Sequence, residues 1–130
     1  MSGPYPNDQS NPAGAIPVWI APGTGGAGFT PVVAAANSVT TGGTAVTVLT
    51  GPIAGGTIAN PLSAAAQGIG AAENLYISFV GTPGSTDAAP GNGTLILVPG
   101  ASYSLPALAD GVTLKANAAT SAHKFTAFSW

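Results

Sequence analysis

The sequence has no cysteine and no arginine, and charged residues make up only 5% of its 130 positions. An ordinary soluble domain carries about 25% charged residues. Without cysteine there is no disulfide framework, no thiolate nucleophile and no cysteine metal site. Lys115 and Lys124 are the two basic side chains apart from one histidine. Two lysines cannot neutralise the row of phosphates that nucleic-acid binding requires, and they give little attraction to an anionic membrane.

Long hydrophobic runs are also missing, although 45% of the residues are hydrophobic. The apolar stretches "TLILVPG" and "NLYISFVG" are far shorter than the roughly 20 residues of a membrane-spanning helix. Residues 1–14 show neither the basic region nor the apolar stretch of a signal peptide, so we expect synthesis in a cytoplasm. A surface with so few charges is prone to association. We therefore expect partner proteins to cover much of it.

Proline and glycine dominate residues 1–31, with six of each. Proline at this density excludes a helix and favours an extended, polyproline-like arm. Within the arm, "IPVWIAP" is apolar at every position. An exposed segment has no reason to be so apolar, so we expect the arm to lie on a neighbouring surface. The candidate contact residues are Ile16, Val18, Trp19, Ile20 and Phe29.

From residue 32 onward, short apolar segments alternate with turn residues at intervals of roughly ten, which predicts about seven strands. The predicted strands are 44–50, 56–60, 73–80, 93–100, 101–107, 111–118 and 123–130. This spacing is typical of an antiparallel β-sandwich or a jelly-roll-like barrel. We therefore predict an all-β domain over residues 32–130, preceded by the arm 1–31.

One segment departs from the strand pattern. "NPLSAAAQG" (60–68) has Asn60 as a possible N-cap, Pro61 at the first helical position and Gly68 as a stop. A turn or two of helix and a loop are equally compatible with it. "GTPGSTDAAPGNG" (81–93) reads as a long connector, with a recognition loop as the alternative.

The titratable residues show no catalytic or metal-binding pattern. Asp8, Glu73, Asp87 and Asp110 each stand alone in a turn or at a strand end, where a solvated carboxylate is the expected role. His123 has no second histidine for a metal site and no obvious residue to orient it. The sequence therefore predicts no catalytic residue, no metal, no cofactor and no enzymatic activity.

The last eight residues, "HKFTAFSW", form two faces if extended. His123, Phe125 and every second residue after them share one face, and the residues between them share the other. We expect Phe125 to fill the core, and Phe128 and Trp130 to meet another subunit or surface. Lys124 has the character of a charge that protects an edge strand from stray pairing.

Several segments resemble tailed-bacteriophage virion proteins. They are "NPAGAIPVWI", "GGTIANP", "ENLYISFVG", "GNGTLILVPGASY" and "NAATSAHKFTAFSW", which together span most of the chain. The resemblance implies a capsid decoration, or cement, protein that binds the assembled head, typically as a homotrimer. Its partners would be the major capsid protein and copies of itself, on the virion surface, after synthesis in the host bacterial cytoplasm. The alternative is a tail-fibre or spike module that binds host-surface glycans.

Overall fold

Short antiparallel strands form nearly all the regular structure in the computed structural model, which describes residues 30–87 and 93–130. All of them except Thr30 belong to one unit that spans Pro31–Trp130. The strands are β1 (Val32–Val33), β2 (Ser38–Val39), β3 (Val46–Thr50), β4 (Gly56–Ala59), β5 (Leu75–Ser78), β6 (Leu95–Leu97), β7 (Ser102–Leu105), β8 (Thr113–Asn117), β9 (His123–Lys124) and β10 (Thr126–Ser129). The prediction of an antiparallel all-β fold is confirmed.

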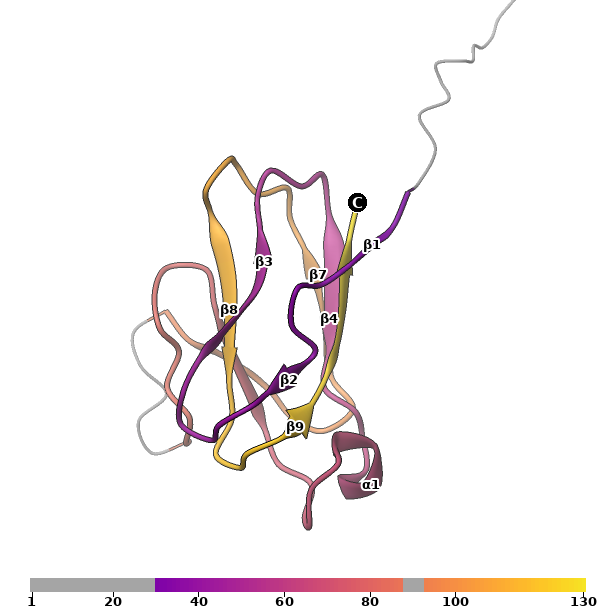
Figure 1. Cartoon of the computed structure of the whole chain (residues 1–130), viewed down its shortest axis with the longest axis vertical. Helices are drawn as coiled ribbons and strands as arrows, with labels where there is room; N and C mark the ends of the chain where they lie inside the picture. The colour runs from indigo at the N-terminus through magenta and orange to yellow at the C-terminus, as the bar shows by residue number, and fades with distance from the viewer. Residues whose placement is uncertain (1–29, 88–92) are drawn as a thin grey trace, which may run out of the picture. The chain divides into compact units, whose positions relative to one another are not determined.

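The strands build two four-stranded sheets and one strand pair (Figure 1). One sheet has the order β1-β10-β4-β7, the other has the order β3-β8-β5-β6, and β2 pairs with β9. Every predicted strand is present. The two-residue strands β1 and β2 were not predicted, because a strand that short has no readable alternation. The predicted strand 123–130 divides at Phe125, since its first part pairs with β2 and its second with β1 and β4.

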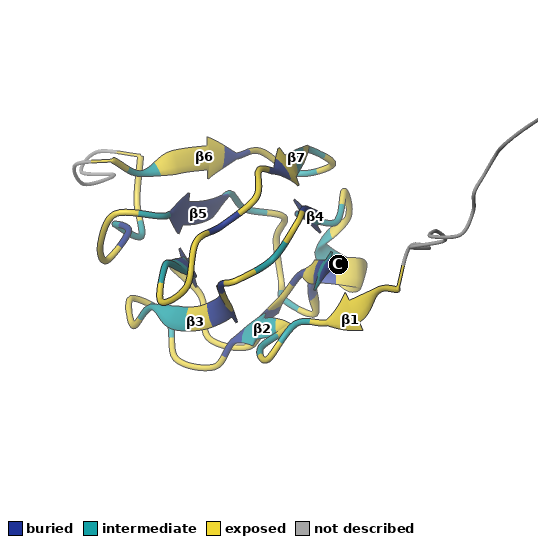
Figure 2. Ribbon diagram, turned by 90° about the horizontal axis from the view of Figure 1, so that it is seen from above, coloured by how far each residue is buried: buried dark blue, intermediate teal, exposed yellow. Residues whose placement is uncertain are grey.

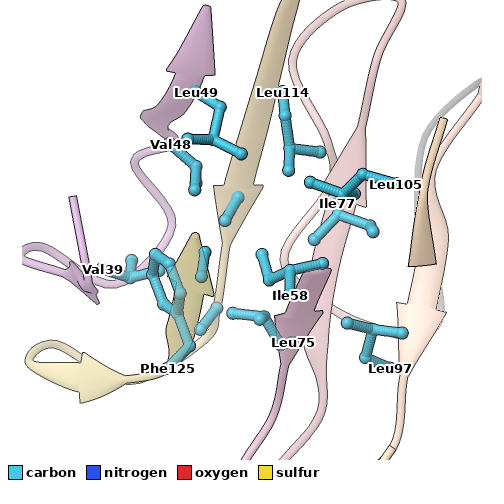
Figure 3. Close-up of a cluster of buried hydrophobic side chains, with 13 residues drawn as sticks. Val39, Val48, Leu49, Ile58, Leu75, Ile77, Leu97, Leu105, Leu114 and Phe125 are labelled. Atoms are coloured by element: carbon cyan, nitrogen blue, oxygen red, sulfur yellow. The ribbon is translucent and has the colours of Figure 1, made fainter. Parts of the chain in front are cut away.

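The hydrophobic core lies between the two large sheets (Figure 3). Ile58 and Leu105 enter it from the first sheet, and Leu75, Ile77 and Leu114 enter it from the second. Val39 and Phe125 come from the segments around the small pair, and Figure 2 shows β5 buried along its length and β1 exposed. Alternating burial in β4 and β10 follows from the period of two in extended chain.

The chain after β1 closes one side of this sandwich. Ala34 donates its backbone N–H to Ala127 in the first sheet at 3.2 Å, and Ala35 donates to Val48 in the second sheet at 3.0 Å. Two consecutive residues thus connect strands of opposite sheets. This crossing places β1 beside the C-terminal strand β10.

A single helical turn, α1 (Ala64–Gln67), follows β4. Its N-cap is Ser63, whose hydroxyl accepts the Ala66 N–H at 3.1 Å, so the prediction of Asn60 as N-cap is wrong. Asn60 is buried and its side chain is bound elsewhere in the core. Gly68 ends the turn as predicted, with a φ of 75° that glycine adopts without the steric cost of a side chain.

Candidate functional site

The C-terminal segment has one buried face and one accessible face within the described domain. His123, Phe125, Ala127 and Ser129 are all at most 5% exposed. On the other face, Lys124, Thr126 and Trp130 are exposed and Phe128 is half-buried. Phe125 is a core residue, as expected. The two aromatic residues predicted to meet a partner therefore lie on the side of β10 that faces outward.

Trp130 is held in place although its side chain is 41% exposed. Its backbone N–H donates to Gly55 at 3.0 Å, and its carbonyl accepts the Ala54 N–H at 2.6 Å. The indole lies so close to Gly55 that a Cβ there would come within 3.0 Å of the ring. The ring centroid of Phe128 lies 6.0 Å from that of Trp130. The last residue thus presents a positioned aromatic surface.

An apolar groove of about 350 Å³ lies beside this tryptophan. Its lining includes Val32, Val33, Val48, Pro52, Ile53 and Trp130, and it contains no charged residue. Val32 and Val33 are 57% and 77% exposed, which is unusual for two adjacent valines in a strand. A contiguous exposed apolar surface is characteristic of a protein contact site. We call this feature the β1 groove.

The other predicted contact residues, Ile16, Val18, Trp19, Ile20 and Phe29, lie outside the described residues. Asp8, the first of the four acidic residues, lies outside them as well.

A second apolar surface surrounds β6, an outer strand of its sheet. Leu95, Ile96 and Val98 are exposed there, and so are Leu62 and Val80. The side chain of Leu62 lies against Gly100, just beyond β6. We call these five residues the β6 surface.

The largest departure from the sequence analysis is a buried polar cluster at the α1 end of the sandwich. His123 is completely buried, with Nδ1 3.0 Å from Glu73 Oε2 and Nε2 2.9 Å from Asn60 Oδ1. Gln67 donates to Asn60 Oδ1 at 3.1 Å and accepts the backbone N–H of Glu73 at 2.9 Å. The interpretation of Glu73 as a solvated, isolated carboxylate is therefore wrong, and so is that of His123 as a residue with nothing to orient it.

The carboxylate of Glu73 has several donors. Its Oε2 also accepts the Thr120 backbone N–H at 2.9 Å, and its Oε1 accepts the Thr120 hydroxyl at 2.7 Å. Partial burial raises the pKa of Glu73, but the hydrogen bonds from His123 and Thr120 outweigh it and lower the pKa below its ordinary value of 4.5. Glu73 is thus held as the carboxylate and joins the turn after β8 to the segment before β5.

Asp87 is also bound, on a separate part of the surface. Its Oδ1 accepts the Tyr76 hydroxyl at 2.6 Å and the Asn74 amide at 2.8 Å. These hydrogen bonds lower the pKa of Asp87 and join the 81–93 connector to β5 and to the residue before it. Asp87 and Asp110 both lie in exposed turns as predicted, although Asp87 is also hydrogen-bonded to its neighbours.

The polar cluster has the side-chain types of an acid–base site but not the access. A catalytic histidine must reach substrate, and His123 has no exposed surface. Another groove, of about 370 Å³, is lined by Lys124, Asn37 and Thr126 among others and contains no carboxylate or histidine. Residues 30–87 and 93–130 hold no group of three metal-ligating side chains. Among the described titratable side chains, Glu73, Asp87 and His123 are engaged in hydrogen bonds within the fold.

No sequence signal linked the cluster residues, because Asn60 and His123 are 63 positions apart and Glu73 and His123 are 50 apart. The available hint was three amide or carboxylate side chains, Asn60, Gln67 and Glu73, within one stretch that is otherwise apolar except for Ser63. No protein-family model, curated protein or solved structure matches the chain. Within the described part of the chain, no helix has the length and apolarity needed to cross a membrane.

Proposed function

We propose that the chain is a structural virion protein of the capsid decoration type, which binds the assembled head and copies of itself, as a homotrimer. The observation that carries the proposal is the β1 groove, a hollow lined by no charged side chain and bordered by Val33 and Trp130. An apolar surface with a positioned aromatic is the usual centre of a protein interface. The resemblance of the sequence to virion proteins supplies the kind of partner, the major capsid protein.

The electrostatic character of the domain supports a packing role. The formal net charge is −2, and the whole chain has only two basic side chains apart from its histidine. Attachment through the β1 groove would depend on apolar area and backbone hydrogen bonds and only weakly on salt. A particle-bound protein keeps such a surface covered, which resolves the aggregation risk of a sparsely charged surface.

The first test is location and copy number. Particles from the source culture are separated on a density gradient and probed with an antibody to the chain. We expect the protein in the fraction with filled heads, at hundreds of copies per particle relative to the major capsid protein. Absence from all particle fractions would refute the virion role. A few copies at the tail would instead favour the glycan-binding tail-fibre or spike function.

The second test assigns the surface with a matched pair of substitutions. Val33, in the β1 groove, and Val80, on the β6 surface, are both 77% exposed. Val33→Asp places a charge in the groove and should weaken binding to particles stripped of the protein by about tenfold or more, because the carboxylate must be desolvated on docking. Val80→Asp should bind as the wild type does. Equal binding by both variants, or loss only with Val80→Asp, would refute the groove as the attachment site.

A further inference from the structure

The hydrogen bonds around His123 determine which groups must donate. The imidazole lies between Glu73 Oε2, 3.0 Å from Nδ1, and Asn60 Oδ1, 2.9 Å from Nε2. Glu73 is already an acceptor for Thr120 through both oxygens, as expected of an ionised carboxylate. Each ring nitrogen therefore faces an oxygen acceptor.

The orientation of the Asn60 amide is settled by its other contacts. Its Nδ2 donates to the backbone carbonyls of Glu73 and Leu97, at 3.0 and 2.9 Å. Rotating the amide would place an oxygen against these two carbonyls and Nδ2 against the donating Gln67 Nε2. Amide orientation is assigned by such networks. Asn60 Oδ1 therefore has to accept from Nε2 of His123.

Only the imidazolium carries a proton on both nitrogens. A neutral ring would turn one lone pair toward either Glu73 or Asn60. The described titratable groups nearby offer no alternative partner: Lys124 is exposed with its stem against Gly68, and Asp87 is bound to Tyr76 and Asn74. On β8, Lys115 faces Thr47 and Ser78 in the strand register.

We propose that His123 is a pH-sensitive clamp. As the imidazolium it joins the segment from β4 through α1 to Glu73 with the turn between β8 and β9, and loss of one ring proton loosens this end of the sandwich. The clamp is a property of the isolated domain, so its test does not depend on the virion role. The local stability of the α1 end would then depend on whether the ring carries both protons.

The chain contains a single histidine, so its protonation state can be read without assignment. The full-length protein is labelled with ¹⁵N-histidine and followed by NMR across pH. At pH about 7 we expect both ring nitrogens to give protonated, imidazolium-type signals. In Glu73→Gln, which keeps the shape but removes the carboxylate, the ring should be neutral at the same pH. A neutral tautomer in the wild type at about pH 7 would overturn the proposal.

Hydrogen exchange tests whether loss of a ring proton loosens the α1 end of the sandwich. The Thr120 amide, which donates to Glu73, should lose protection by about tenfold between about pH 6 and pH 8.5 after correction for intrinsic exchange, as expected for one unmatched buried polar pair. The Gly51 amide, bound to Val112 at 2.7 Å, is the internal control and should change little. The Gly68 and Ile69 amides report on the α1 end. In Glu73→Gln, the drop in their protection between these pH values should be absent. Unchanged Thr120 protection in the wild type, or an equal loss at Gly51, would overturn the clamp.

Discussion

Replacing Asn60 tests whether the polar cluster organises the α1 end of the domain. The Asn60 side chain is buried and takes part in four hydrogen bonds, two donated to carbonyls and two accepted from Gln67 and His123. At a net contribution of about 1 kcal/mol per buried hydrogen bond, Asn60→Ala should lower the free energy of unfolding by about 4 kcal/mol. That is a large share of the roughly 5–15 kcal/mol typical of a domain.

Asn60→Asp separates hydrogen bonding from packing, because the two side chains have nearly the same shape. The new oxygen would lie about where Nδ2 now lies, 3.0 and 2.9 Å from two carbonyl oxygens. We expect a loss of stability at least as large as that of the alanine variant, despite the added negative charge beside His123. The comparison shows whether the loss comes from the pattern of donors and acceptors or from lost volume.

The assay is equilibrium unfolding in urea, analysed for the midpoint and the slope. Asn74→Ala is the matched control, because the Asn74 amide donates a side-chain hydrogen bond to the exposed Asp87. It should shift the midpoint far less than either Asn60 variant. If Asn60→Asp retained the wild-type midpoint, or if Asn60→Ala and Asn74→Ala shifted it equally, the reasoning about the cluster would be refuted.

Four further predictions concern the tail, a strained turn and acid. Phe125→Ala removes a core ring and should cost about 3–5 kcal/mol in urea unfolding; a midpoint like that of the wild type would place the ring outside the core. Trp130→Ala should leave the domain folded by circular dichroism but weaken self-association in sedimentation or particle binding, and global unfolding would contradict its surface role. Ala122 has a φ of 68°, so Ala122→Gly should raise the free energy of unfolding by up to about 1 kcal/mol, whereas the control Ala65→Gly, within α1, should lower it by about 1 kcal/mol; similar effects from both would argue against strain. Because the folded state lowers the pKa of Glu73, its contribution to stability is present above pH 4.5 and is lost as the pH falls below it; thermal unfolding of Glu73→Gln should lack this part of the acid dependence, and an identical acid profile would contradict the assignment.

The sequence alone predicted the fold class and most of the strands. Alternation with a period of two, interrupted by glycine and proline, is a local signal, since successive side chains of a strand face opposite sides. For the same reason it predicted that Phe125 is buried and that Trp130 lies on the other face. The sparse charge, a property of composition, indicated a surface suited to partners.

The tertiary structure decided everything that depends on contacts between distant residues. It brought Glu73 and Asn60 to the two sides of His123 across 50 and 63 positions of chain. It also made Ser63, and not Asn60, the N-cap of α1. It placed β1 beside Trp130, and together they border the β1 groove. Neither periodicity nor composition records which strands become neighbours, because pairing is selected by the packing of the whole core. A buried polar residue acquires its role only from the partners that this packing brings to it.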